Sequence, residues 1–315
     1  MIRSNRLGWL APRRIVTLIL LLVLCIDIQG QSPAQADLLR KAYSKHSKSL
    51  LYSFFDNWSD EISSNENESP NKWVAEAHKV FAAFYQPLEL EKIGCRNEDK
   101  DLYKNSRYFI IQDTLQNIYM ADSIPFAPDE LESYYISRIE QKYPNDSIRM
   151  GYIKMVEREK HNRELAPVFD IDYSAFSSIG IPTTEVVSNI SFRPPVQFTD
   201  RKIVYLTSKY KRLLDNFLGN EHIDLGTENI MQVARSKGSS RKRMEFINNA
   251  CKIFYGHWGG YWQYETYPRA VEIIFNPEMN RAVVKFQYVY EGGEAILEKQ
   301  NGEWKVVDFR FTWVE

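Results

Sequence analysis

The strongest constraint on the fold is a set of four extended segments near the C-terminal end of the sequence. Each segment is rich in β-branched and aromatic residues, and they span 270–275, 281–290, 295–299 and 304–313. Turn-forming residues separate them: Asn280, Gly292-Gly293 and Asn301-Gly302. Asn-Gly is a strong signal for a two-residue hairpin turn. The pattern therefore predicts an antiparallel meander of four strands.

Helical patterns precede this meander. From Asp37 through Trp58, apolar residues recur at three- and four-residue spacing, which predicts one long helix with His46 inside its apolar stripe. Further helices are expected between start and stop signals at about 71–86, 128–142, 148–165, 208–218, 228–235 and 240–255. Helices followed by a meander indicate an α+β protein in which the helices cover one face of a curved antiparallel sheet.

The first half of the chain is less regular than the second. Residues 107–120 have the composition of one strand or a hairpin, and 203–206 that of a short strand. Prolines and serines alternate with short apolar runs over 166–195, which predicts an irregular connection. We expect a helix-rich α+β domain over 37–200 and a C-terminal α+β domain over 201–315.

Residues 1–36 have the layout of a secretory signal peptide. Four arginines lie in the first 14 residues, Ile15–Ile26 is apolar apart from one threonine, and small residues follow. Cleavage after Gly30 and cleavage after Ala36 both fit. The sequence thus predicts export, to the periplasm or outside the cell. No second apolar segment of membrane length follows, so no transmembrane segment is expected in the mature chain.

Two other interpretations of this terminus remain open. Cys25 is a candidate for lipidation, although Leu22-Val23-Leu24 lacks the small residue that a lipoprotein signal places before its cysteine. An uncleaved membrane anchor is the second alternative, although the apolar run is short for a bilayer span.

Composition and charge restrict the partners. The net charge is −1, so nothing in the overall charge favours nucleic acid. Cys95 and Cys251 remain after removal of the signal, either as a disulfide or as two isolated buried thiols. Paired metal-ligand spacings and catalytic motifs such as a Walker loop are missing from the sequence, and we expect no cofactor and no metal.

The C-terminal third resembles the nuclear transport factor 2-like superfamily, a cone of helices on a bent sheet. The likeness is carried by "RAVVKFQYVYEGGEAILEKQNGEWKVVDFRFTWVE", in which strands alternate with tight turns and the last strand begins at Trp304-Lys305-Val306-Val307. The superfamily contains isomerases and dehydratases, binding modules and secreted members without activity, so the resemblance implies a cavity but not a chemistry. The residues before Ile203 carry no such resemblance.

The stretch "YGHWGGYWQYETYP" (255–268) is the main candidate site. It holds six aromatic residues, three glycines and one histidine. Its aromatic rings could stack on a sugar or another flat ligand, or could clamp the sheet to the rest of the chain. His257 and Glu265 could form an acid–base pair near a cavity. The candidate ligand-binding residues within the stretch are His257, Trp258, Tyr261 and Trp262.

Three further candidates lie on the predicted strands. Ala282, Val284, Phe286, Tyr288 and Tyr290 should share the inward face of one strand, which makes Tyr288 and Tyr290 candidates for binding a ligand at its end. In the last strand, the apolar residues that should face inward change from even to odd sequence positions. Either a β-bulge near Val306 shifts the phase, or Asp308 turns inward and becomes a candidate acid or base.

A short basic run, "KGSSRKR", lies at an expected helix start. Lys237, Arg241, Lys242 and Arg243 could bind an anion there, because a helix N-terminus favours negative charge. A solvated basic turn is the alternative.

These observations predict an exported envelope protein that binds a small apolar or glycan ligand, or a protein partner, without catalysis. The alternative is an isomerase, dehydratase or hydrolase that uses Asp308 or His257 as a base. A third possibility is a purely structural partner-binding protein, which predicts a filled cone and an exposed aromatic patch.

Overall fold

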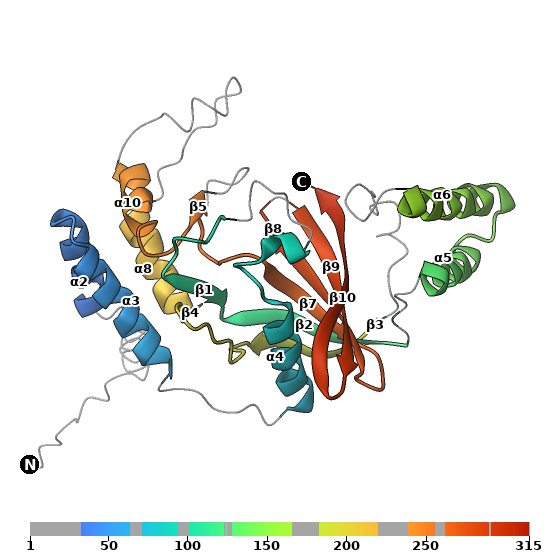
Figure 1. The fold of residues 1–315 in the computed structure, drawn as a ribbon, viewed down its shortest axis with the longest axis horizontal. Coiled ribbons are helices and arrows are strands. Elements are labelled where there is room, and N and C mark those ends of the chain that lie inside the picture. The colour runs from blue at the N-terminus through green and yellow to red at the C-terminus, as the bar shows by residue number, and fades with distance from the viewer. Residues whose placement is uncertain are drawn as a thin grey trace, which may run out of the picture.

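The structure, a computed structural model, describes residues 33–63, 71–93, 101–122, 124, 128–165, 183–219, 239–255, 262–289 and 291–314. Its helices are α2 (Pro33–Ser44), α3 (Lys48–Ser63), α4 (Lys72–Phe84), α5 (Pro128–Lys142), α6 (Asp146–Leu165), α8 (Ser208–Leu218) and α10 (Ser239–Ile247), with a 3₁₀ turn at Leu90–Ile93. Helices packed with a mixed sheet confirm the predicted α+β class (Figure 1).

The strands belong to three sheets. They are β1 (Tyr108–Gln112), β2 (Thr114–Ala121), β3 (Thr183–Ser191), β4 (Lys202–Leu206), β5 (Phe254–Tyr255), β6 (Trp262–Gln263), β7 (Arg269–Phe275), β8 (Arg281–Tyr288), β9 (Glu291–Gln300) and β10 (Glu303–Val314). The large sheet has the order β10-β9-β8-β7-β2-β3, in which only β2 and β7 are parallel. β1 pairs in parallel with β4, and β5 pairs with β6.

The predicted meander is confirmed by the antiparallel order of β7 to β10. One expected turn is wrong, since Gly292 and Gly293 lie inside β9. Gly293 pairs with Phe286 on one side and with Phe311 on the other. Because a glycine has no side chain, the two phenyl rings meet above it, with centroids 5.6 Å apart.

The long helix expected from Asp37 is interrupted. The chain forms α2 and α3 instead, and His46 between them has a φ of 48°, in the left-handed region. The hydroxyl of Ser47 then accepts a hydrogen bond from the backbone N–H of Leu50, in the manner of an N-cap. The apolar stripe continues across the break, which is why its spacing alone did not reveal it.

The helix expected over about 240–255 ends early, at Ile247. The Asn249 side chain donates to the carbonyl oxygens of Glu245 and Phe246 over 3.1 and 3.0 Å, and so occupies acceptors at the helix end. Asparagine competes in this way with helix continuation. By contrast, α8 begins after Thr207 and ends at Gly219, as predicted. α4 begins close to its expected start, where Asn71 provides the N-cap.

Residues 107–120 form two strands that are not a hairpin. β1 is buried along its whole length beside β4, whereas β2 joins the large sheet between β7 and β3. Asp113 stands between the two strands, where it pairs with Arg193 at 2.9 Å. Consecutive segments therefore enter different sheets, because each is paired by a strand distant in sequence.

The expected irregular connection contains a strand as well. β3 is an edge strand, and Ile190 is its one buried residue among those described. An exposed, mostly polar strand gives little apolar alternation, so the sequence pattern did not identify it.

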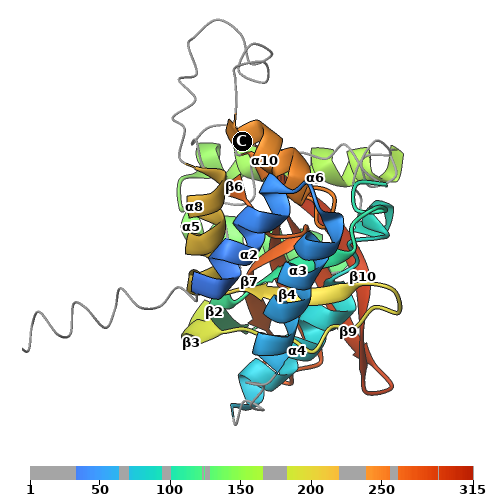
Figure 2. The ribbon, with the colours of Figure 1, turned by 90° about the vertical axis from the view of Figure 1, so that its left-hand side faces the viewer.

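The expected division between residues 200 and 201 lies within one continuous core. β2 and β3 from the first part share a sheet with β7 to β10 from the second, and α3 packs on β4. A single hydrophobic cluster draws on both parts. Figure 2 shows α2 and α3 in front of the strands, with α8 and α10 beside them.

Candidate functional site

Of the aromatic stretch, the structure describes Tyr255 and residues 262–268, and Trp262 lies against α8. Its indole Nε1 donates to the carbonyl oxygen of Gly219 over 3.2 Å, and the Tyr255 ring meets the indole edge-on at 4.9 Å. Gly219 has a φ of 84°, a left-handed conformation that suits glycine and ends α8. Trp262 is thus buried against the end of a helix and not directed into a cavity.

Tyr264 is the second connection between the stretch and α8. Its hydroxyl donates to Oδ1 of Asp215 over 2.6 Å, and Lys211 bonds the other oxygen of the same carboxylate at 2.9 Å. Burial is the largest cause that raises the pKa of Tyr264, and the bond to Asp215 adds to it. The hydroxyl therefore remains a hydrogen-bond donor at any physiological pH.

Thr266 and Tyr267 connect the stretch to two other elements. The hydroxyl of Thr266 accepts from the N–H of Ile110 in β1 over 3.0 Å, and its carbonyl accepts from Tyr85 over 3.3 Å. The N–H of Tyr267 donates to the hydroxyl of Tyr103 over 2.9 Å. Residues 262–267 therefore connect β1, α8 and the chain after α4, and every polar group named here has a partner inside the protein.

The other expected ligand-binding residues are distributed differently. Tyr288 is 2% exposed, and its ring packs edge-on against Tyr267 at 5.6 Å. His257, Trp258, Tyr261 and Tyr290 lie outside the described residues. Glu265, the expected partner of His257, lies 4.0 Å from the guanidinium of Arg269.

Asp308 is placed by the β-bulge that the sequence suggested. The pairing of β10 with β9 shifts between Val306 and Asp308, which confirms the bulge. Phe309 consequently packs on the main core, whereas Asp308 pairs with Ile296 on the opposite face of the sheet. The Asp308 carboxylate is partly exposed and accepts from the N–H of Phe309 at 2.9 Å. The sheet itself thus separates Asp308 from Trp262 and Tyr288.

The space expected for a cavity, between α4 and the sheet, is filled by phenyl rings. Phe84 of α4 lies 5.5 Å from Phe286 and 6.5 Å from Phe309, measured between ring centroids. Phe286 in turn contacts Phe311. These rings pack at the separations usual for aromatic pairs in protein cores.

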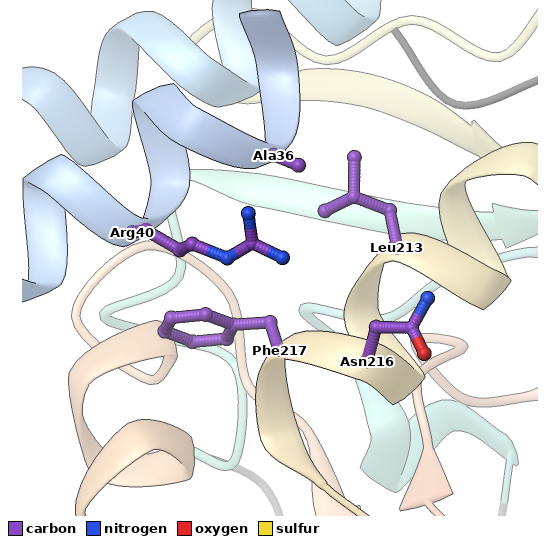
Figure 3. A pocket seen from close by; sticks show the side chains of 5 residues that line it. All are labelled: Ala36, Arg40, Leu213, Asn216 and Phe217. Atoms are coloured by element: carbon purple, nitrogen blue, oxygen red, sulfur yellow. The ribbon is translucent and has the colours of Figure 1, made fainter. Parts of the chain in front are cut away.

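A small hollow lies between α2 and α8. Figure 3 shows Arg40 reaching from α2 across it, above Phe217 of α8. Its volume is about 10 Å³, which is close to the space needed for one water molecule. It is lined by Ala36, Arg40, Leu213, Asn216 and Phe217. The sequence pattern gave no signal for it, because its lining comes from two helices distant along the chain.

The candidate anion site is largely used for internal contacts. Arg241 pairs with Glu245 at 2.9 Å, and Arg243 donates to the carbonyl oxygen of Phe217 over 2.7 Å while its guanidinium lies near that ring. Lys242 is exposed, and Lys237 lies outside the described residues. Two of the three described cations thus stabilise the helix and its packing on α8.

Among the described carboxylates, Glu76 has the most strongly lowered pKa, and sequence reasoning missed it. Glu76 of α4 accepts hydrogen bonds from Lys79 at 2.7 Å and from Lys299 and Trp304 at 2.9 Å each. Burial opposes ionisation of Glu76, but these three bonds outweigh it and lower the carboxyl pKa to about 2. Glu76 lies beside the apolar stripe of α4, and nothing in the sequence around it shows that residues of distant strands will contact it.

A second such arrangement is an aromatic column at α3. Rings of Tyr108, Phe55, Trp58 and Tyr210 follow one another at 4.8, 5.7 and 4.2 Å, nearly parallel. The terminal hydroxyls donate to carboxylates of α3, Tyr108 to Asp56 over 2.9 Å and Tyr210 to Glu61 over 2.7 Å. Burial is the largest cause that raises the pKa of both tyrosines, and the hydrogen bonds to the carboxylates raise it further. These hydroxyls therefore act as structural donors.

Within the described part of the chain, no group of three or more histidines, cysteines, aspartates or glutamates is arranged to hold a metal ion. Of the described helices, none is both long and apolar enough to cross a bilayer. Comparisons with protein families, with curated proteins and with solved structures find no match to this chain.

Proposed function

We propose that this chain is an exported protein that acts by binding a partner at its surface, without catalysis. The observation that carries the proposal is the filled interior: phenyl rings of α4, β8 and β10 occupy the side of the sheet on which a cone would hold its ligand. Because described side chains fill that side of the sheet, we assign recognition to the outer surface of the protein.

The aromatic stretch supports the same proposal. Trp262, Tyr264 and Thr266 use their polar groups on α8 and β1, so the described part of the stretch acts as a scaffold. The signal-like terminus supports export, and the meander with α4 on its inner face is consistent with a nuclear transport factor 2-like arrangement.

The enzymatic alternative gains no comparable support. Asp308 lies on the face of the sheet opposite to α4, beside Ile296, and bonds its neighbouring backbone. His257 lies outside the described residues.

Thermal-shift screening of the mature chain against glycans, lipids and metabolites tests the proposal, with Trp262→Phe beside the wild type. Loss of the bond to Gly219 should lower the stability of the variant by about 1 kcal/mol whether or not a compound is present. We expect no small molecule to stabilise the wild type through this region. A compound that stabilises the wild type but not the variant would overturn the proposal, because a native-state ligand must raise stability.

A further inference from the structure

A cation lies over each end of the aromatic column. The ammonium group of Lys209 lies 5.2 Å from the ring centroid of Tyr210. At the other end, the guanidinium of Arg107 lies 5.8 Å from the ring centroid of Tyr108 and 4.7 Å from that of Tyr52 on α3. Because the face of an aromatic ring attracts a positive charge, these rings restrict the position of both cations.

The cation at the Tyr210 end has a carboxylate of its own. Oε2 of Glu61 accepts from the Tyr210 hydroxyl over 2.7 Å, and Oε1 of the same side chain forms an ion pair with Lys209. A single acidic residue of α3 thus bonds the tyrosine and balances the charge above its ring.

At the Tyr108 end, the cation over the ring has no such partner. Oδ1 of Asp56 accepts from the Tyr108 hydroxyl over 2.9 Å and from the ammonium group of Lys202 over 2.7 Å. Asp56 is close enough to attract Arg107, but Arg107 forms no ion pair with any residue that the structure describes. The two ends of the column therefore differ by one positive charge, which is not balanced at the Tyr108 end.

Two further carboxylates near this end are already paired. Asp101 forms an ion pair with Lys104 at 3.5 Å, in the turn before β1, and Asp200 forms one with Arg201, in the segment before β4. Arg201 also donates to the carbonyl oxygen of Lys104 over 2.9 Å, so the two pairs lie side by side. These pairs leave the charge of Arg107 unbalanced.

Arg107 is held firmly but remains accessible. Its N–H donates to the carbonyl oxygen of Ala250 over 2.8 Å, and its carbonyl oxygen accepts from the N–H of Lys202 over 3.1 Å. Arg107 is nevertheless exposed, and so is Lys48, which lies one turn before Tyr52 on the same face of α3. A planar guanidinium offers a fork of N–H donors that matches a carboxylate or a phosphate. A side chain that its surroundings already restrict loses little freedom on binding.

A membrane surface suits this site less well than a single acidic group does. Anionic headgroups bind dense clusters of lysine and arginine, whereas Lys104, Arg201 and Lys202 are bonded here to carboxylates of the protein itself. One unbalanced cation beside the partly exposed ring of Tyr52 is better matched to one acidic group on a sugar ring.

We propose that the Tyr108 end of the aromatic column binds the carboxylate of an acidic sugar, with Arg107 as the bidentate donor and Lys48 as a second cation. The inference rests on the proposed surface binding and deepens it, since it gives that surface a location and its ligand a chemical class.

An NMR titration of the mature chain with trigalacturonate tests the inference. We expect a saturable shift of the Nε–Hε signal of Arg107, with a dissociation constant on the order of 1 mM at low salt. Added salt should weaken the binding, because the contact lies at the surface. The fully methyl-esterified trisaccharide keeps the sugar rings but lacks the charges, and it should not shift the signal.

Three variants separate the charge of Arg107 from its geometry. Arg107→Gln should weaken the binding about fivefold. Arg107→Lys keeps the charge but loses the planar fork, and should show a smaller loss. Arg212→Gln is the matched control and should leave the binding unchanged, since Arg212 is an exposed arginine of α8 whose Nε donates to the carbonyl oxygen of Ser208. Amide spectra of the variants verify that each one is folded.

No saturable binding of trigalacturonate, or equal affinity in Arg107→Gln, would refute the inference. A response to inorganic phosphate or to phosphatidylglycerol vesicles, without one to trigalacturonate, would refute the acidic sugar and assign the site to a phosphate ion or to a membrane. Binding that Trp262→Phe removes and Arg107→Gln leaves intact would contradict the proposed function as well, because it would move the ligand to the aromatic stretch.

Discussion

The indole Nε1 of Trp304 donates to Oε2 of Glu76 over 2.9 Å and so joins β10 to α4. The ammonium group of Lys299 donates to the same oxygen at the same distance. One carboxylate thereby holds the β9–β10 hairpin against the helix that covers the inner face of the sheet. Glu76 and its two partners Lys299 and Trp304 are far apart in the sequence, so this charged contact joins distant segments of the chain.

Glu76→Gln should therefore destabilise the protein. The amide keeps the shape of the side chain but loses the charge that bonds Lys79 and Lys299, which should cost about 2 kcal/mol and lower the melting temperature by about 5 °C. Differential scanning calorimetry checks this expectation. Glu303→Gln, an exposed glutamate at the start of β10, is the matched control. Equal melting temperatures for the two variants would contradict the role assigned to Glu76.

The same carboxylate should make stability depend on acid. Its folded-state pKa of about 2 lies below the ordinary value of 4.5, so the folded state holds fewer protons than the unfolded state between these values. The contribution of Glu76 is present above about pH 4.5 and is lost as the pH falls toward 2. Urea unfolding at several pH values should show a smaller loss of stability over this window in Glu76→Gln than in the wild type.

His78 should add a second pH dependence at milder acidity. Its Nε2 is buried and has no hydrogen-bond partner among the described residues. Its ring contacts Phe192 edge-on at 5.1 Å, and burial lowers its pKa below the ordinary 6.5. The unfolded state then binds a proton first, so stability is complete above about pH 6.5 and falls as the pH drops below it.

Urea unfolding at pH 8 and pH 5.5 measures this effect. His78→Gln should reduce the difference between the two pH values, whereas His46→Asn should not. His46 is an exposed histidine with positive φ, a conformation that asparagine tolerates. A pH difference that His46→Asn removes and His78→Gln leaves intact would contradict the assignment.

The parts of the fold that sequence predicted are those with local signals. The meander has alternation along its strands and turn residues at two of its three connections, Asn280 and Asn301-Gly302, and α4 and α8 have caps next to their apolar stripes. The parallel pairings had no such signal. Tyr108 pairs with Lys202 and Asn117 with Glu272, and pairing between distant segments leaves no periodic trace in either one.

The candidate site shows the same limit. Aromatic clusters of the same composition can pack into a core or bind a ligand. Only the contacts with residues distant in sequence distinguish a core cluster from a binding site. For Trp262 and Tyr264 these partners are Gly219 and Asp215. The bulge near Val306 could be predicted, because the apolar residues of this strand shift from even to odd positions within one continuous segment.

Thr266→Val tests the scaffold role of the aromatic stretch. The hydroxyl of Thr266 accepts from the buried N–H of Ile110, and valine has the same shape without that acceptor. A buried N–H left without a partner should cost about 2 kcal/mol. Chemical denaturation measures this loss, and Thr184→Val on the exposed β3 is the control, expected to change stability little. A Thr266→Val protein as stable as the wild type would show that the stretch does not hold β1.

The cleavage point of the expected signal peptide is the last prediction. Cleavage after Ala36 would remove Pro33 to Ala36, the first turn of α2, and Ala36 lines the hollow against Leu213 and Phe217 (Figure 3). Cleavage after Gly30 keeps that turn and its packing. We therefore expect intact-mass analysis of the exported chain to give Gln31 as the first residue. A chain prepared to begin at Asp37 should melt at a lower temperature than one beginning at Gln31, because the shortened helix loses a turn and the contact of Ala36 with α8. Export with Asp37 first, together with equal melting temperatures, would mean that the first turn of α2 contributes nothing to the mature fold.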